Sequence, residues 1–229
     1  MTILALDTSM GACSAAVLRT NGAERKLFVR QEAMARCHAE ALMPMVAEIM
    51  AEAGLAFAEI DLIAATTGPG SFTGVRIAIS AARGFALVTK AKLFGADSLT
   101  VMAKVALAHG ALGSGPFAVA VDARRGMVYF GLYDAAGDKL EGPLLIAPDE
   151  AVRLLPSGLR IAVGSGAVLL AEAGALQGRA VEASLPELQP SAEALAGIAD
   201  ASGETCPTLR PLYLRPPDAK PQMQAVLRR

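Results

Sequence analysis

The feature that most constrains the fold is a pattern that the chain shows twice. A short apolar segment ending in aspartate occurs as TILALD at residues 2–7 and again as FAVAVD at 117–122. A glycine follows each aspartate by four residues, at Gly11 and at Gly126. Continuous apolar runs of this length are typical of buried strands. The pattern predicts two halves of similar design, each starting with a buried strand that ends in a carboxylate.

The segments that follow these strands also correspond. Second strands are expected at 12–20 and 127–133, and each precedes a hairpin turn pair, Asn21-Gly22 or Gly137-Asp138. The other expected elements are strands at 24–30, 62–67 and 160–163 and helices at 36–53, 73–89, 166–173 and 191–201. An internal duplication of a β-β-β-α-β-α unit accounts for this order. The alternative is two unrelated α/β halves with similar turns.

We therefore predict an α/β chain with the actin-like (ASKHA) fold, in which two β-β-β-α-β-α units form two subdomains around a cleft. The expected subdomains are residues 1–110 and 111–217, followed by a tail at 218–229. In active members of that fold, the two aspartate turns face the phosphates and the metal ion of a nucleotide. Asp7 and Asp122 hold the corresponding positions in this chain.

Composition narrows the classes of function. The 229 residues are 53% hydrophobic, with a formal net charge of −1, three cysteines and two histidines. A chain of this balance is expected to fold around a core and to bind RNA weakly by itself. Scattered cysteines indicate reduced thiols, and two histidines disfavour a histidine-based metal site. Charges interrupt the apolar runs and no basic leader is seen, so we expect a cytoplasmic location without a membrane anchor.

The turn after the first strand is a candidate anion site. Asp7, Thr8 and Ser9 offer a carboxylate and two hydroxyls. With Asp122 as a second carboxylate, such a turn could receive a phosphate or a magnesium ion. Few glycines surround either aspartate, and the opposing interpretation is that both aspartates bond to loop N–H groups at strand ends. We favour this structural role and keep weak nucleotide contact open.

The loop GPGSFTGVR at 68–76 is a second candidate. It lacks the lysine that ends a P-loop and the glycine spacing of a dinucleotide-binding loop. Ser71 or Thr73 suits the N-cap of the following helix, and a helix N-terminus there could attract an anion. We predict a tight strand-to-helix turn, with anion binding as a secondary use.

The two helices of the first half are apolar over more of their circumference than a one-sided surface helix requires. Surplus methionine at the edge of the first apolar stripe suits an adaptable contact surface. The alternative is a large core that covers both helices. The residues expected at a protein–protein interface are His38, Leu42, Met43, Met50, Val75, Arg76, Ile79, Ala82, Arg83 and Ala86. His38 also fits a capping or solvent-facing histidine.

Five motifs together resemble one family. They are LALDTS near the N-terminus, HAEALMP at 38–44, GPGSFTGVR at 68–76, DARRGMVY at 122–129 and PLYLRP at 211–216. They follow one another along nearly the whole chain, and on them the chain is similar to the TsaB family, also called YeaZ.

This resemblance implies a role in making threonylcarbamoyladenosine next to the anticodon of tRNA. It implies a noncatalytic partner that binds TsaD, or a second copy of itself, through the N-terminal half. It further implies TsaE as a component of the complex, tRNA bound only through the complex, no cofactor of its own, and ATP or ADP at the TsaD interface. TsaD-like chains carry a pair of metal-binding histidines in an HxxxH arrangement, and this sequence has no such pair.

Two functions of different classes follow. The first is a scaffold and activator that binds TsaD without turnover of its own. The alternative is an independent phosphotransferase or ATPase that uses Asp7 and Asp122 with a magnesium nucleotide. A protease receives no support, because the sequence has neither metalloprotease histidines nor a G-x-S-x-G elbow.

Overall fold

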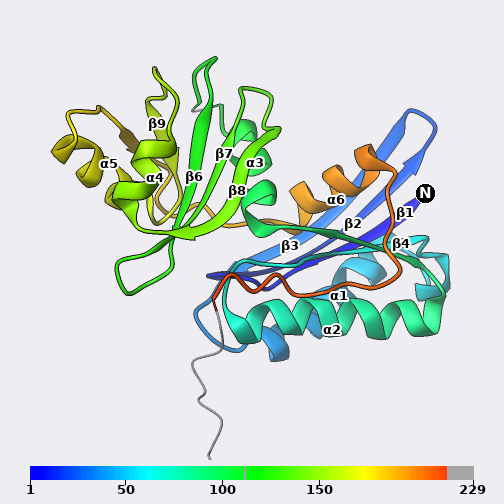
Figure 1. Ribbon diagram of the computed structural model, residues 1–229. Helices are drawn as coiled ribbons and strands as arrows, with labels where there is room; N and C mark the ends of the chain where they lie inside the picture. Colours follow the sequence, from blue (N-terminus) through cyan, green and yellow to red (C-terminus); the bar gives the residue numbers. More distant parts are fainter. Residues whose placement is uncertain (111, 216–229) are drawn as a thin grey trace, which may run out of the picture.

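The computed structural model describes residues 1–110 and 112–215, which form two lobes (Figure 1). The first half of the chain contains β1 (Thr2–Asp7), β2 (Ala12–Asn21), β3 (Glu24–Ala33), α1 (His38–Ala53), the short helix η1 (Phe57–Glu59), β4 (Leu62–Thr66), α2 (Phe72–Thr89), β5 (Lys92–Ala96) and α3 (Ser98–Ala108). The second half contains β6 (Phe117–Asp122), β7 (Val128–Tyr133), β8 (Lys139–Ile146), α4 (Pro148–Leu154), β9 (Ile161–Val163), α5 (Ala167–Leu176), β10 (Glu182–Ser184) and α6 (Ala192–Ser202).

The two halves build sheets of the same topology. The strand orders are β3-β2-β1-β4-β5 and β8-β7-β6-β9-β10, with the first three strands of each half antiparallel and the others parallel. The predicted duplication and the actin-like fold class are confirmed. The repeated unit is longer than predicted, because β5, α3 and β10 were not expected, whereas α6 corresponds to the helix predicted at 191–201. The counterpart of α1 is the seven-residue α4, which was not predicted from the sequence.

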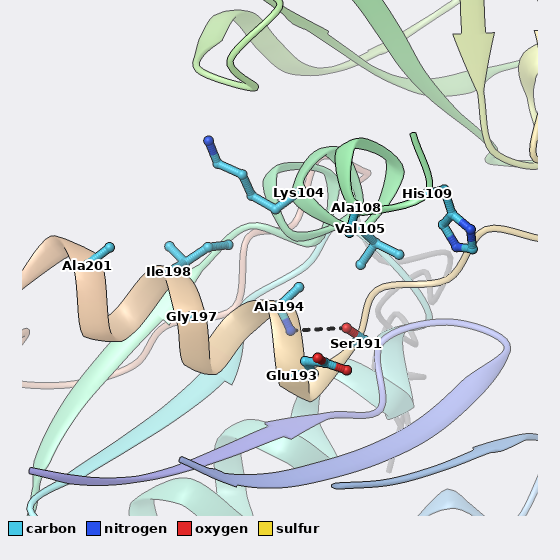
Figure 2. A pocket seen from close by; sticks show the side chains of 10 residues that line it. All are labelled: Lys104, Val105, Ala108, His109, Ser191, Glu193, Ala194, Gly197, Ile198 and Ala201. Carbon is cyan, nitrogen blue, oxygen red and sulfur yellow. Dashed lines mark hydrogen bonds between the residues drawn. The ribbon is translucent and has the colours of Figure 1, made fainter. Parts of the chain in front are cut away.

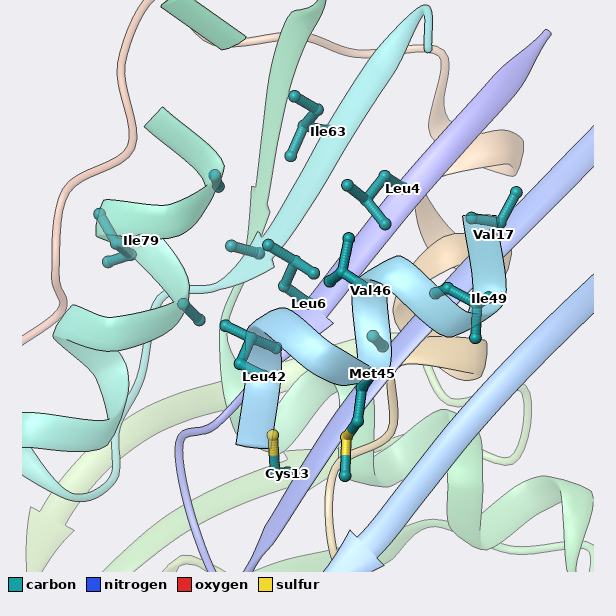
Figure 3. Close-up of a cluster of buried hydrophobic side chains, with 14 of the residues drawn as sticks. Leu4, Leu6, Cys13, Val17, Leu42, Met45, Val46, Ile49, Ile63 and Ile79 are labelled. Carbon is teal, nitrogen blue, oxygen red and sulfur yellow. The ribbon is translucent and has the colours of Figure 1, made fainter. Parts of the chain in front are cut away.

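The first sheet is covered on both faces, which explains why TILALD is apolar throughout. Leu4 and Leu6 point to the face covered by α1 and α2, whereas Ile3 and Ala5 point to the face covered by α6. All six residues of β1 are buried. Figure 3 shows the side with α1 and α2, where Leu42 of α1 lies beside Leu6 of β1 and Ile79 of α2 belongs to the same buried cluster.

Packing does not follow the predicted division at residue 110. α6 comes from the second half in sequence but packs on β1 and β2, and α3 packs on β6 and β7. The chain then returns along the first lobe, where Cys206 N–H donates to Leu93 O at 2.8 Å and Leu212 N–H donates to Thr67 O at 2.7 Å. The first lobe therefore includes α6 and the segment 203–215, which we call the C-terminal strap. The predicted tail at 218–229 lies outside the described residues.

Candidate functional site

The aspartate turn of the first half lies buried beneath the start of α2. Gly70 and Gly74 allow this approach, because a Cβ atom on them would lie 2.2 Å from Ser9 O and 2.0 Å from Thr8 O. Ser71 N–H donates to Ser9 O at 2.8 Å, and Thr8 Oγ1 donates to Gly74 O at 2.6 Å. The glycines of GPGSFTGVR therefore serve close backbone packing of helix against turn. The predicted strand-to-helix turn is confirmed, and Ser71 is the N-cap residue, accepting from Gly74 N–H at 3.1 Å.

Asp7 is enclosed in a cluster of hydroxyl groups. Its Oδ1 accepts from Ser9 Oγ at 2.7 Å and from Thr66 Oγ1 at 2.5 Å, and Ser98 Oγ donates to Ser9 Oγ at 3.0 Å. Within the part of the chain that the structure describes, Asp7 Oδ2 has no hydrogen-bond partner. Burial raises the pKa of this carboxyl to about 6, although the hydrogen bonds from Thr66 and Ser9 lower it.

This enclosure bears on the nucleotide hypothesis. Asp7, Thr8 and Ser9 are each 0% exposed, so none of them offers an atom to a ligand in this conformation. The hydroxyl of Thr8 is engaged twice, because it also accepts from Ala78 N–H at 3.1 Å. The geometry thus supports the structural interpretation of the first turn and leaves the phosphotransferase alternative without its first carboxylate.

Asp122, the counterpart in the second half, lines an open cleft instead. The cleft has a volume of about 390 Å³, and its walls include Gly11, Ser71, Asp122, Arg124, Ser165 and Gln189. Asp122 Oδ1 accepts from Arg124 N–H at 2.7 Å, and its Oδ2 pairs with Arg124 Nη1 at 3.3 Å. The structure therefore brings Ser71 and Asp122 to one cleft and separates both from the buried Asp7.

The side chains around the cleft do not build a metal centre. Across residues 1–110 and 112–215, His, Cys, Asp and Glu side chains form no group of three or more that could hold a metal ion. His38, at the start of α1, is half-buried and its Nε2 lies 3.0 Å from Met10 O, in the loop after β1. It therefore anchors the helix to that loop.

The predicted interface residues fall into two groups. Five of them are buried in the core between the first sheet and its helices: Leu42, Met50, Val75, Ile79 and Ala82. The expectation that these side chains contact a partner is wrong, because β1, β4 and the neighbouring helix already cover them. The first sheet and the neighbouring helix cover this buried side of each helix.

The two predicted arginines of α2 are exposed but contact the C-terminal strap. Arg76 Nε donates to Tyr213 Oη at 2.6 Å, and its guanidinium lies 3.9 Å from the ring centre of Phe72. Arg83 donates to Leu209 O, and Ala86 is half-buried beside the same segment. This role was not predicted from the sequence, since the strap is more than 120 residues away along the chain.

Exposed apolar side chains remain on the outward sides of the same helices. Met43 of α1 is 50% exposed, and Leu87 and Val88 of α2 are 73% and 81% exposed. Exposed small residues occupy nearby positions on the same sides of these helices, and we define the outer face as Met43, Ala47, Ser80, Gly84, Leu87 and Val88. Met43 was among the predicted interface residues, whereas Leu87 and Val88, which stand opposite the buried stripe of α2, were not.

The apolar character of α2 has a second consequence. Among the described residues, it is the one helix long and apolar enough to cross a membrane by length and composition. It packs on the first sheet, and five of its 18 residues are buried. The rest of this apolar helix is at least partly exposed.

A separate groove lies between the two helices that connect the lobes. It has a volume of about 550 Å³ and runs between α3 and α6 (Figure 2). Val105 and Ala108 from α3 face Ala194 and Ile198 from α6. Its lining also includes the polar side chains of Lys104, His109 and Glu193, and the two helices that form it pack on different lobes.

Comparison with known proteins shows the family to which this fold belongs. The sequence model of the family described as TsaD, tRNA N6-adenosine threonylcarbamoyltransferase, matches residues 29–183. The solved structure of YeaZ from Pseudomonas aeruginosa is similar with a TM-score of 0.77 at 32% identity, covering 93% of this chain and 99% of that chain.

Two relatives extend the comparison. TsaB of Haemophilus influenzae, named a tRNA threonylcarbamoyladenosine biosynthesis protein, is 39% identical over 131 residues, which are 57% of this chain and 52% of the relative. An uncharacterized protein of Mycobacterium tuberculosis is 34% identical over 223 residues, covering 96% of this chain and 94% of that protein. The chain thus spans about half the length of the named TsaB relative that it matches.

The duplicated topology of the two sheets defines a chain of the actin-like fold class. Its match to the family model and its similarity to YeaZ over nearly the whole chain identify it as a member of the TsaD-like family, on the TsaB (YeaZ) branch.

Proposed function

We propose that this chain is a noncatalytic subunit in the synthesis of threonylcarbamoyladenosine in tRNA, and that it binds TsaD through the outer face. The names of its TsaB relatives support the pathway, since they are described as proteins of threonylcarbamoyladenosine biosynthesis. The observation that carries the binding role is the outer face itself. An apolar helix with five of 18 residues buried leaves Leu87 and Val88 in water.

The physical properties of the face suit a protein partner. Small residues at Ala47, Ser80 and Gly84 permit close approach of another backbone, and Met43 adapts its shape to the contact. Burial of such side chains contributes roughly 25 cal/mol for each Å² of apolar surface. In the absence of TsaD, the outer face of one chain can pack against the outer face of a second copy, which gives the expected homodimer.

The buried turn is consistent with a subunit that has no turnover of its own. Asp7 cannot reach a nucleotide in this conformation, and α2 lies directly above the turn. In this proposal, catalysis belongs to TsaD, TsaE joins the complex, and the subunits act together in the cytoplasm.

A reconstituted modification assay tests this function. TsaD, TsaE and this chain are incubated with unmodified tRNA, ATP and a threonylcarbamoyl donor. Modified adenosine is measured by mass spectrometry of digested tRNA. We expect formation of the modified nucleoside to require the chain and to be lost with Val88→Asp. Modification that proceeds equally well without the chain would contradict the proposal.

The variant needs a matched control. Leu176→Asp replaces a side chain that is 90% exposed at the end of α5, in the other lobe, and should leave modification unchanged. Substitutions at Ile79 or Ala82 are unsuitable, because a buried unpaired carboxylate would unfold the chain instead of testing the face.

The open cleft favours a second, subsidiary function. We propose that ATP or ADP contacts Ser71 and Asp122 when TsaD completes the site, because the N-terminus of α2 opens onto this cleft. Calorimetry with magnesium ATP should show no binding to the isolated chain and binding to the complex that weakens with Ser71→Ala. Tight binding to the isolated chain that is lost with Asp7→Asn would support the phosphotransferase alternative instead.

A further inference from the structure

A cluster of aromatic rings and arginines lies at the N-terminal end of α2, beside the mouth of the cleft. Phe72 at the start of α2 stacks on Tyr213 of the strap, with ring centres 5.2 Å apart. The guanidinium of Arg76 lies close to both rings, 3.9 Å from the ring centre of Phe72 and 5.6 Å from that of Tyr213. Phe72 and Tyr213 are still 48% and 41% exposed, so this cluster presents flat aromatic surface to solvent.

The cluster continues into the other lobe through the end of the strap. Arg215 lies two residues after Tyr213, and its Nη2 donates to Arg124 O at 3.4 Å. Ser71, next to Phe72, lines the same cleft as Arg124. These two connections make a continuous surface, which we call the aromatic–arginine patch: Phe72, Arg76, Arg124, Tyr213 and Arg215.

The charge of the patch is unusual for this chain. Three arginines gather there, whereas the whole sequence carries a net charge of −1. The side chain of Arg124 is 84% exposed, and it is held at a turn where residues 124 and 125 both have left-handed backbone angles, φ 63° and 57°. Asp122 offsets part of this charge through its contact with Arg124 at 3.3 Å.

This combination of charge and exposed rings suits an RNA ligand. Guanidinium groups neutralise phosphates, and exposed aromatic rings and arginine planes stack on unpaired bases. The outer face, by contrast, has apolar and small residues suited to a protein partner. We propose that the aromatic–arginine patch contacts the tRNA substrate directly within the complex, with stacking on a base by Phe72 or Tyr213 and phosphate contacts from Arg124 and Arg215.

This inference rests on the proposed function, and it adds a direct role in substrate binding. The net charge predicts that the isolated chain binds tRNA weakly, so the patch acts when TsaD supplies further contacts. The tests therefore use the whole complex with unmodified tRNA as the probe.

The first test removes charge while keeping long polar side chains. Arg124→Gln with Arg215→Gln should raise the apparent KM for tRNA about tenfold, while kcat at saturating tRNA falls much less. The dependence of binding on salt should weaken by about one unit of log–log slope for each arginine that no longer neutralises a phosphate. Lysine at both positions keeps the charges and should restore most of the affinity. Arg153→Ala, an exposed arginine of α4, is the control and should leave KM unchanged.

The second test separates stacking from hydrogen bonding. Tyr213→Phe removes the hydrogen bond with Arg76 but keeps the ring, and should retain tRNA affinity. Tyr213→Ala removes the ring and should weaken tRNA binding several-fold. Unfolding curves for both variants show whether the strap remains in place.

The outcomes distinguish the inference from the proposed function. In one outcome, the complex requires the chain but the glutamine variants leave the KM for tRNA and the salt slope unchanged. This result would contradict tRNA binding by the aromatic–arginine patch and leave the proposed function intact. Failure of these variants to bind TsaD would assign the patch to a protein contact and would also overturn the inference. If modification does not require the chain at all, the proposed function itself fails.

Discussion

The two aspartate turns have the same sequence pattern but different surroundings. Asp7 is sealed beneath α2, and its Oδ2 has no partner among the described residues, whereas Asp122 faces an open cleft and pairs with Arg124. The difference comes from the loop between strand and helix. In the first half it brings Gly70 and Gly74 onto the turn, and in the second half it is shorter and places Gly166 against the backbone of β6. In a duplicated fold, one of the two aspartate turns can thus hold a helix in place while the other faces an open cleft.

The strongest effect is expected at Gly74, which permits the close packing of α2 on the first aspartate turn. Gly74→Ala places a Cβ atom 2.0 Å from Thr8 O, so α2 must move away from the turn. We expect the free energy of unfolding to fall by about 3 kcal/mol, measured by urea denaturation. Gly84→Ala in the same helix meets no described atom within 4 Å and should instead gain about 1 kcal/mol. Equal effects of the two substitutions would show that α2 is not tightly packed on the first aspartate turn.

Buried Asp7 predicts a specific dependence of stability on pH. Its folded pKa, about 6, lies above the ordinary aspartate value of 3.8, so folding disfavours the charged form. The contribution of Asp7 to the free energy of unfolding is fully present below about pH 4. It decreases as the pH rises to about 6 and is constant above that pH. The difference corresponds to about 3 kcal/mol, at roughly 1.4 kcal/mol for each pKa unit.

Unfolding curves from pH 4 to pH 8 measure this decline. Asp7→Asn should remove it, whereas Asp122→Asn should retain it because Asp7 is intact. A decline that persists in Asp7→Asn would place the titrating group elsewhere.

The weakest effect is expected at the second turn. The Asp122 side chain is 31% exposed and the Arg124 side chain is 84% exposed, so solvent screens their ion pair. Asp122→Ala should therefore cost about 1 kcal/mol or less in the free energy of unfolding. A cost as large as that of Gly74→Ala would mean that the two turns are equally structural, and would remove the contrast between them.

Much of the fold could be predicted because its signals are local. The runs TILALD and FAVAVD and the pair Asn21-Gly22 correctly placed β1, β6 and the hairpin of β2 and β3. Short elements gave weak signals, and α4, with seven residues, and β10, with three, were not identified. The strand β5 and the 11-residue helix α3 were also not predicted. The crossing of α6 to the first sheet depends on contacts between distant segments, which no local pattern contains.

The candidate interface was predicted on the right helices but with the wrong side chains. Val75, Ile79 and Ala82 are apolar because they pack in the core under the first sheet, and sequence periodicity does not distinguish an internal surface from a partner. Leu87 and Val88 are the apolar residues of α2 that face outward. Their exposure in the folded chain distinguishes them from the core residues.

A calorimetric titration of TsaD with this chain tests the role of the outer face most directly. We expect saturable binding by the wild-type chain and by Leu176→Asp, and about 100-fold weaker binding by Val88→Asp, because the complex would bury an unpaired carboxylate. Equal affinities for Val88→Asp and the wild-type chain, with both folded, would contradict the claim that the outer face is the site where this subunit meets its partner.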